Sequence, residues 1–87
     1  MSKEARDLKE EAHYMFDELW GRKVFAPRST LQNNRKLAYE WLADELCMPI
    51  TDCHIANFNN TTCKRVIEIC KRRQIYEGIY KSRIHNR

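Results

Sequence analysis

The first apolar stripe of the chain lies in residues 3–20, where hydrophobic side chains recur every three or four positions among charged ones. This spacing predicts an amphipathic α-helix with one buried face. Ser2 can cap its start, and Gly21 stands where a left-handed residue commonly ends a helix. The residues expected to face the core are Ala5, Leu8, Ala12, Met15, Phe16 and Leu19.

A second and broader apolar face predicts a helix over residues 33–47. A face this wide indicates a helix packed on two sides at the centre of a small bundle. Trp41 is the expected core anchor, because a side chain of its size buries the most area. Ser29 can cap the start of this helix, because Ser29 and Gln32 have the spacing of a capping box. Asn33 and Asn34 are equally good candidate caps.

A third helix is predicted over residues 60–77, with Asn59 or Asn60 as its cap. It follows a connection, residues 49–59, in which a short helical turn is expected at about residues 52–55. The remaining residues, 78–87, are expected to form a basic tail.

The apolar stripe of the third helix changes phase after Arg73. Either the helix breaks near Gly78 and the end folds back, or one continuous helix leaves a patch outside the core, and such patches mark partner surfaces. The face before the change holds Cys63, Val66, Ile67 and Cys70, and the opposite face after it holds Ile75, Tyr76, Ile79 and Tyr80.

Together these elements predict an all-α fold, a small three- to four-helix bundle, in one domain spanning residues 1–87. Two glycines and two prolines in 87 residues also favour helices over a turn-rich β fold. No apolar run is long enough to span a bilayer and the first residues lack an apolar signal segment, so an intracellular protein is expected. Its four cysteines are then expected as thiols or metal ligands.

The net charge of +4 is unevenly distributed. Residues 64–87 carry eight lysines and arginines against two glutamates, a net charge of +6, whereas residues 1–63 carry eight against ten acidic residues, a net charge of −2. Such asymmetry favours an acidic partner. The candidate contact residues are the basic Lys64, Arg65, Lys71, Arg72 and Arg73 with the apolar Ile75, Tyr76, Ile79 and Tyr80.

The cysteines and histidines show no spacing typical of a zinc finger, because the chain has no C-x₂-C and no H-x₃-H pair. A small structural zinc site built from Cys53, His54, Cys63 and Cys70 is an alternative, and buried thiols that pack as small hydrophobes are the simpler interpretation. Adjacent Cys53 and His54 point in different directions, so an activated nucleophile is not expected. We therefore expect no enzyme and no required cofactor.

Several segments also carry a family resemblance: AHYMFDELW, AYEWLADEL, CHI, Phe58 and TCKRVIEIC. In this order, residues 4–70 resemble the C-terminal helical half of small phage and prophage proteins, a zinc-finger-containing domain family of unknown function. The N-terminal half of that family carries a CxxC-type finger, and this chain has no such pair. The resemblance implies a phage origin and a bacterial host cytoplasm. Its motif matches Cys53, His54 and Cys63 without implying a role for them.

The leading functional hypothesis is a non-catalytic interaction protein that binds a host protein or ribonucleoprotein, for example to inhibit a defence complex. The first alternative is a nucleic-acid-binding module that uses the basic third helix, and the second is the structural zinc module. The apolar patch also predicts self-association into a homodimer, and no membrane partner is expected.

Overall fold

The computed structural model describes residues 2–80 as an all-helical fold of three α-helices, α1 (Lys3–Gly21), α2 (Leu31–Glu45) and α3 (Asn60–Tyr76). Two short 3₁₀ turns, η1 (Ile50–Asp52) and η2 (Ile55–Asn57), lie between α2 and α3. The predicted all-α bundle is therefore confirmed, and the single helical turn expected at residues 52–55 is instead a pair of turns that flank Cys53 and His54. None of the helices within residues 2–80 combines the length and the hydrophobicity that a membrane span requires.

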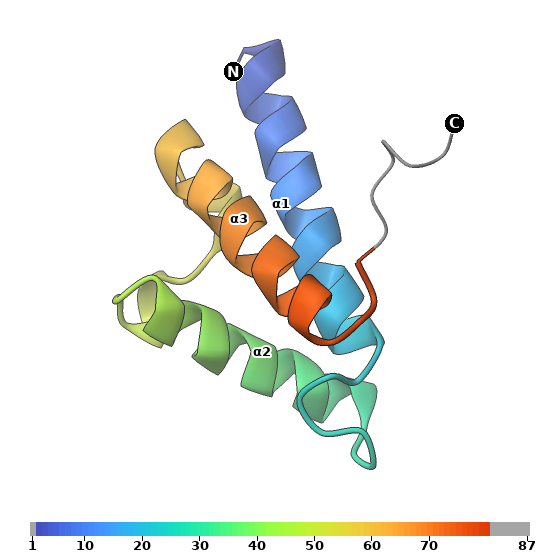
Figure 1. The fold of residues 1–87 in the computed structure, drawn as a ribbon. Helices are drawn as coiled ribbons and strands as arrows, with labels where there is room; N and C mark the ends of the chain where they lie inside the picture. The colour runs from blue at the N-terminus through green and yellow to red at the C-terminus, as the bar shows by residue number, and fades with distance from the viewer. Residues whose placement is uncertain (1, 81–87) are drawn as a thin grey trace, which may run out of the picture.

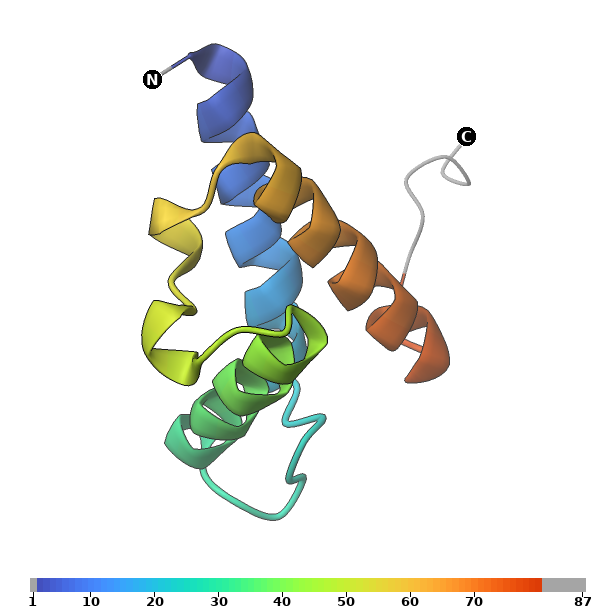
Figure 2. The ribbon, with the colours of Figure 1, turned by 90° about the vertical axis from the view of Figure 1, so that its left-hand side faces the viewer.

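The centre of the bundle is α1, which packs against α3, against α2 and against η2 (Figures 1 and 2). The prediction that the second helix occupies the centre is wrong. Its broad face is covered instead by α1, by η1 and by the connector after α1, from which Phe25 contacts Trp41 with ring centroids 5.4 Å apart. Trp41 is therefore a half-buried edge residue rather than the core anchor.

The buried core draws on every described element except η1. Its largest fully buried apolar side chains are Phe16, Leu19, Leu42, Ile55 and Val66. Burial of apolar side chains is the main favourable term in folding, so this cluster holds the three helices together. The other buried hydrophobic residues are Ala12, Met15, Ala38, Ala43, Cys53, Phe58, Cys63, Ile69 and Cys70.

The second helix starts two residues earlier than predicted, because Thr30 rather than an asparagine is its N-cap. The Thr30 hydroxyl accepts a 3.0 Å hydrogen bond from the Asn33 amide. Asn34 has a different task. Its buried side chain accepts from the Ala26 N–H and donates to the carbonyl oxygens of Ala26 and Thr30, at 2.8 to 2.9 Å. It thereby fastens the connector between α1 and α2.

All three helices end in the same hydrogen-bonded turn, a Schellman motif with one left-handed residue. For α3 that residue is Gly78, with a φ of 76°, and the Ile79 N–H donates back to the Gln74 carbonyl at 2.9 Å. For α1 and α2 it is Lys23 and Cys47, each with a φ of 57°. The expectation that Gly21 takes this position is wrong, because Gly21 is the last residue of α1 itself.

Candidate interaction surface on the third helix

The third helix begins at Asn60 because the Asn59 side chain caps it, accepting a 2.8 Å hydrogen bond from the Thr62 amide. Its buried stripe packs on α1 and leaves the opposite face outward. Two Lys–Arg pairs stand on that outward face, seven residues apart along the helix. Seven residues are close to two helical turns, so the second pair repeats the position of the first.

The two pairs form two parallel ridges, because neighbouring residues on a helix differ by about 100° in direction. Lys64 and Lys71 make the lysine ridge, and Arg65 and Arg72 make the arginine ridge; all four side chains are exposed. Glu68 is exposed between the ridges. None of these five residues forms an ion pair with another residue in the described part of the chain.

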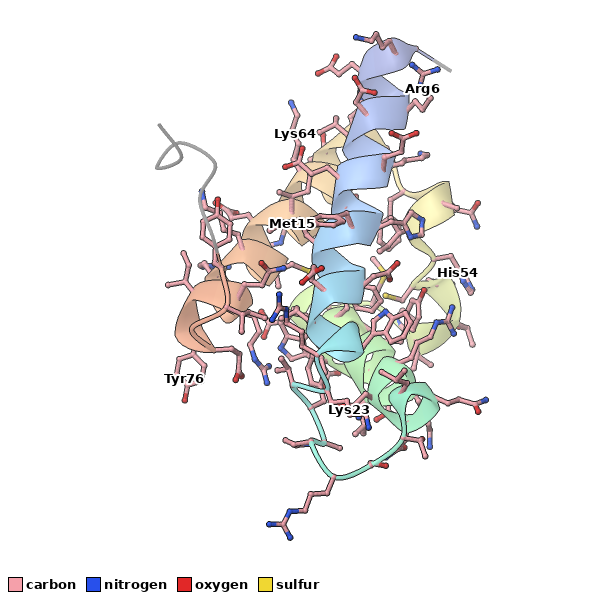
Figure 3. The ribbon with its side chains drawn as sticks, turned by 90° about the vertical axis from the view of Figure 1, so that its right-hand side faces the viewer. Arg6, Met15, Lys23, His54, Lys64 and Tyr76 are labelled. Carbon is pink, nitrogen blue, oxygen red and sulfur yellow. The ribbon has the colours of Figure 1, made fainter. Side chains whose placement is uncertain are left out.

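Each ridge ends at a tyrosine near the C-terminus of α3. On the lysine ridge, the Lys71 ammonium lies 5.4 Å from the centre of the half-buried Tyr80 ring, within cation–π range. On the arginine ridge, Tyr76 follows Arg72 by one turn, and 84% of its surface is exposed. Figure 3 shows Tyr76 projecting from this end of α3, away from α1, with Lys64 near the opposite end.

The apolar patch expected at the end of the helix is divided in two by Gly78. Ile75 is 56% exposed and stays with Tyr76 on the outward face. Beyond Gly78 the chain turns back, as the first of the two alternatives predicts, and Ile79 and Tyr80 pack against the core. Among the described residues, the exposed part of this patch is therefore smaller than four residues would make, and self-association stays a prediction.

Arg73 does not belong to the outward face, although the sequence places it beside Arg72. Its guanidinium lies 4.7 Å from the ring centre of Phe25 and 5.4 Å from that of Trp41, and it pairs with Glu77 at 2.8 Å. The side chain is 25% exposed. Arg73 therefore packs at the edge of the core, between α3, α2 and the connector, and its charge is paired with Glu77.

The cysteines and His54 differ in how far solvent reaches them. Cys53, Cys63 and Cys70 are buried, whereas His54 and Cys47 are exposed. Cys63 donates a weak 3.9 Å hydrogen bond to the Phe58 carbonyl, which also accepts a 2.6 Å bond from the Lys9 ammonium. Burial raises the pKa of the Cys53 and Cys63 thiols, and burial with the nearby Asp17 charge raises the pKa of Cys70 to about 12.

These donors do not fit a zinc site. Within residues 2–80 no three histidine, cysteine or acidic side chains come together where a metal ion would sit. The sequence alternative of a site from Cys53, His54, Cys63 and Cys70 is therefore not supported by where these side chains lie.

Two polar residues that sequence reasoning passed over hold the surface in place. Gln74 is buried on the inner face of α3 and donates a 2.8 Å hydrogen bond to the Met15 carbonyl of α1. Lys9 reaches from α1 to the Phe58 carbonyl just before α3. The burial of Gln74 could have been predicted from the sequence, because the residue stands four positions after Cys70 and therefore continues the apolar stripe. Nothing local in the sequence marks Lys9.

The sequence model of a family described as a zinc-finger-containing domain matches residues 1–73 of the 87-residue chain. The matched segment contains both Lys–Arg pairs and ends before Tyr76. No curated protein and no solved structure matches the chain.

Proposed function

The chain belongs to the family of zinc-finger-containing domains, and we propose that it acts as a non-catalytic interaction domain that binds a negatively charged host protein or ribonucleoprotein. The binding surface in this proposal is the outward face of α3. It consists of the lysine ridge, the arginine ridge, and Ile75 with Tyr76 at their C-terminal end.

The observation that carries the proposal is the exposure of four basic side chains without a carboxylate partner in the described part of the chain. The basic residue Arg22 pairs with Glu18, and Arg73 pairs with Glu77, both at 2.8 Å. An excess of unpaired positive charge on one helix face creates a potential that attracts a negatively charged partner and speeds its association.

A binding role also agrees with the placement of the reactive side chains. Cys53 and His54 are neighbours in sequence, yet the thiol is buried and the imidazole is exposed. A nucleophile needs a base within hydrogen-bonding reach and access to a substrate. The buried thiols pack in the core instead, where a free cysteine behaves as a small hydrophobic residue.

The resemblance to phage and prophage proteins extends the proposal to the partner's origin. A small phage protein that binds without catalysis would act on a complex of the bacterial host, and a defence complex that it inhibits is the first partner to test. This extension rests on the resemblance to those phage and prophage proteins.

The test compares two charge-reversal variants with the same net charge. Arg65→Glu/Arg72→Glu reverses the arginine ridge, whereas Arg28→Glu/Lys36→Glu reverses two exposed charges in the connector and at the start of α2. Tagged protein is used to capture partners from a bacterial lysate, and captured species are identified by mass spectrometry. We expect a defined complex with the wild type and the control variant, and its loss with the ridge variant. A complex that survives ridge reversal overturns the proposal.

A further inference from the structure

We infer that the outward face of α3 binds a single strand of nucleic acid, with phosphates on the two basic ridges and a base stacked on Tyr76. This inference rests on the proposed function, since it uses the same surface and names the part of a ribonucleoprotein that the surface would contact. It needs no metal and no covalent step.

The composition of the surface favours nucleic acid over a folded protein. Four exposed lysines and arginines surround one glutamate, and the only apolar members are Ile75 and Tyr76. The centre of a protein–protein interface is depleted in lysine and glutamate, although arginine and tyrosine are enriched there. Interfaces with nucleic acid are more polar and far more positively charged.

The spacing of the charges suits a strand that runs along the helix. The pair Lys64 and Arg65 is separated from the pair Lys71 and Arg72 by seven residues, or about 10 Å at a rise of 1.5 Å per residue. Stacked nucleotides advance by about 3.4 Å each, so this distance covers about three of them. The two pairs therefore lie within reach of phosphates at both ends of a short strand.

Tyr76 supplies the reason for choosing a single strand. The residue is 84% exposed and stands one turn beyond Arg72. An aromatic ring on a basic surface stacks on the face of a base, and the faces are free only where the strand is unpaired. In a duplex the same faces are covered by neighbouring base pairs, so Tyr76 would add nothing to duplex binding.

Glu68 is the one feature of the surface that opposes phosphate. It is exposed between the two ridges and carries no ion pair with the other described residues. Its charge repels a phosphate held between the ridges, and its oxygens can accept hydrogen bonds from base amino groups. Replacing it with glutamine is expected to strengthen binding of a mixed-sequence strand a few-fold, by removal of the repulsion.

The test uses the full chain and fluorescence anisotropy with a labelled single strand of about 12 nucleotides, as RNA and as DNA. A duplex of the same length and an acidic peptide of similar charge are the comparison ligands. With four phosphate contacts, affinity for the single strand should fall about 50-fold between about 50 and 200 mM salt. We expect the single strand to bind more tightly than the duplex or the peptide.

The variants separate charge from stacking. Tyr76→Ala should weaken single-strand binding about tenfold, Tyr76→Phe should retain it, and Tyr14→Ala, which removes an exposed tyrosine from α1, should have no effect. Arg65→Glu/Arg72→Glu should abolish binding, whereas Arg28→Glu/Lys36→Glu should leave most of it. Circular dichroism checks that each variant is folded.

Two results overturn the inference. One is a wild-type chain that binds no single strand at low salt, or that binds the acidic peptide more tightly than the strand. In that case the proposed function still stands if the ridge variant loses its captured host complex, and the surface then contacts protein. The other is a Tyr76→Ala variant that binds as tightly as Tyr14→Ala, because the base then does not stack on Tyr76.

Discussion

The side-chain amide of Gln74 in α3 donates a 2.8 Å hydrogen bond to the main-chain carbonyl of Met15 in α1, and the bond is buried. Fifty-nine residues separate the two partners in sequence. The Met15 carbonyl lies inside a helix, so Gln74 adds a second donor to a group that α1 already uses. This contact fixes α3 on α1 at the point where the outward face reaches Tyr76.

Replacing Gln74 tests that contact. Gln74→Met keeps the volume and removes the hydrogen bond, so the free energy of unfolding should fall by about 1 kcal/mol in a urea titration. Gln74→Glu should cost more at neutral pH, because it places a carboxylate against a carbonyl oxygen in a buried site. Burial raises the pKa of such a carboxyl above its unfolded value of about 4.3, so the extra cost should vanish as the pH falls to about 4. An extra cost that is independent of pH would contradict this.

Arg73 and Arg72 are neighbours with different predicted effects on stability. Arg73→Ala removes the contacts with Phe25 and Trp41 and the pair with Glu77, so the free energy of unfolding should fall by about 1 to 2 kcal/mol. Arg73→Lys keeps the charge without the planar group, so its free energy of unfolding should lie between those of the wild type and Arg73→Ala. Arg72→Ala changes an exposed residue and should stay within about 0.5 kcal/mol of the wild type.

Tryptophan fluorescence is the second readout for this pair, because Arg73 lies over Trp41. Emission should shift for Arg73→Ala and stay unchanged for Arg72→Ala. Equal loss of stability in the two alanine variants would show that the aromatic contacts of Arg73 contribute nothing.

At each of the three left-handed positions that end the helices, glycine should be more stable than a residue with a side chain. Lys23 and Cys47 hold a φ of 57°, which costs a side-chain-bearing residue about 1 to 2 kcal/mol. Lys23→Gly and Cys47→Gly should each raise the melting temperature by a few degrees, after the greater entropy of unfolded glycine is subtracted. Gly78→Ala should lower it, because a φ of 76° strains alanine even in open space.

Gly21→Ala is the matched control for these helix ends. Gly21 also has open space around its Cα, but it is a helical residue without a positive φ. Alanine should therefore stabilise α1 by about 0.5 to 1 kcal/mol at this position. Thermal melts of Gly21→Ala and Gly78→Ala that move in the same direction would contradict the assignment of Gly78 as the left-handed residue.

The buried thiol of Cys70 predicts a loss of stability at alkaline pH. Burial, with a smaller effect from Asp17, raises its pKa from 9.0 to about 12 in the folded chain. A pKa raised on folding contributes stability that is present below the unfolded value and lost as the pH rises, here between about 9 and 12. The free energy of unfolding should fall with a slope of up to about 1.4 kcal/mol per pH unit from this group.

Cys70→Ala isolates the contribution of the thiol from other groups that titrate in the same range. The variant starts less stable because it loses a buried sulfur. Its stability should then decline less steeply than that of the wild type above pH 9. Parallel decline in both proteins would assign the alkaline loss to groups other than Cys70, the buried thiols of Cys53 and Cys63 among them.

Removal of metal tests the arrangement of the cysteines. Because no three metal-binding side chains gather at one place within residues 2–80, a chelator should leave helicity and melting temperature unchanged. Cys47 is exposed and should react quickly with a thiol reagent, while the other three react only as the chain opens. One zinc ion per chain in native mass spectrometry, with unfolding on chelation, would contradict this.

Much of the fold was predictable because it is encoded locally. The period of the apolar residues predicted all three helices. Ser2 was recognised as an N-cap from its residue type and its place before the first stripe, and Asn59 was one of the two candidate caps of the third helix. The outward position of both Lys–Arg pairs follows from the same period, since they stand opposite Val66 and Cys70 on the wheel. These features depend on neighbours within one or two helical turns.

The sequence by itself therefore determined three amphipathic helices and a basic outward face, whereas the tertiary structure decided which residues lie on that face. Arg73 is not on the outward face, because its guanidinium packs on Phe25 and Trp41, which lie 48 and 32 residues earlier in the sequence. Ile79 and Tyr80 are not on the outward face either, because the chain turns back to the core at Gly78. Contacts of this kind depend on how distant segments pack, and local periodicity carries no information about them.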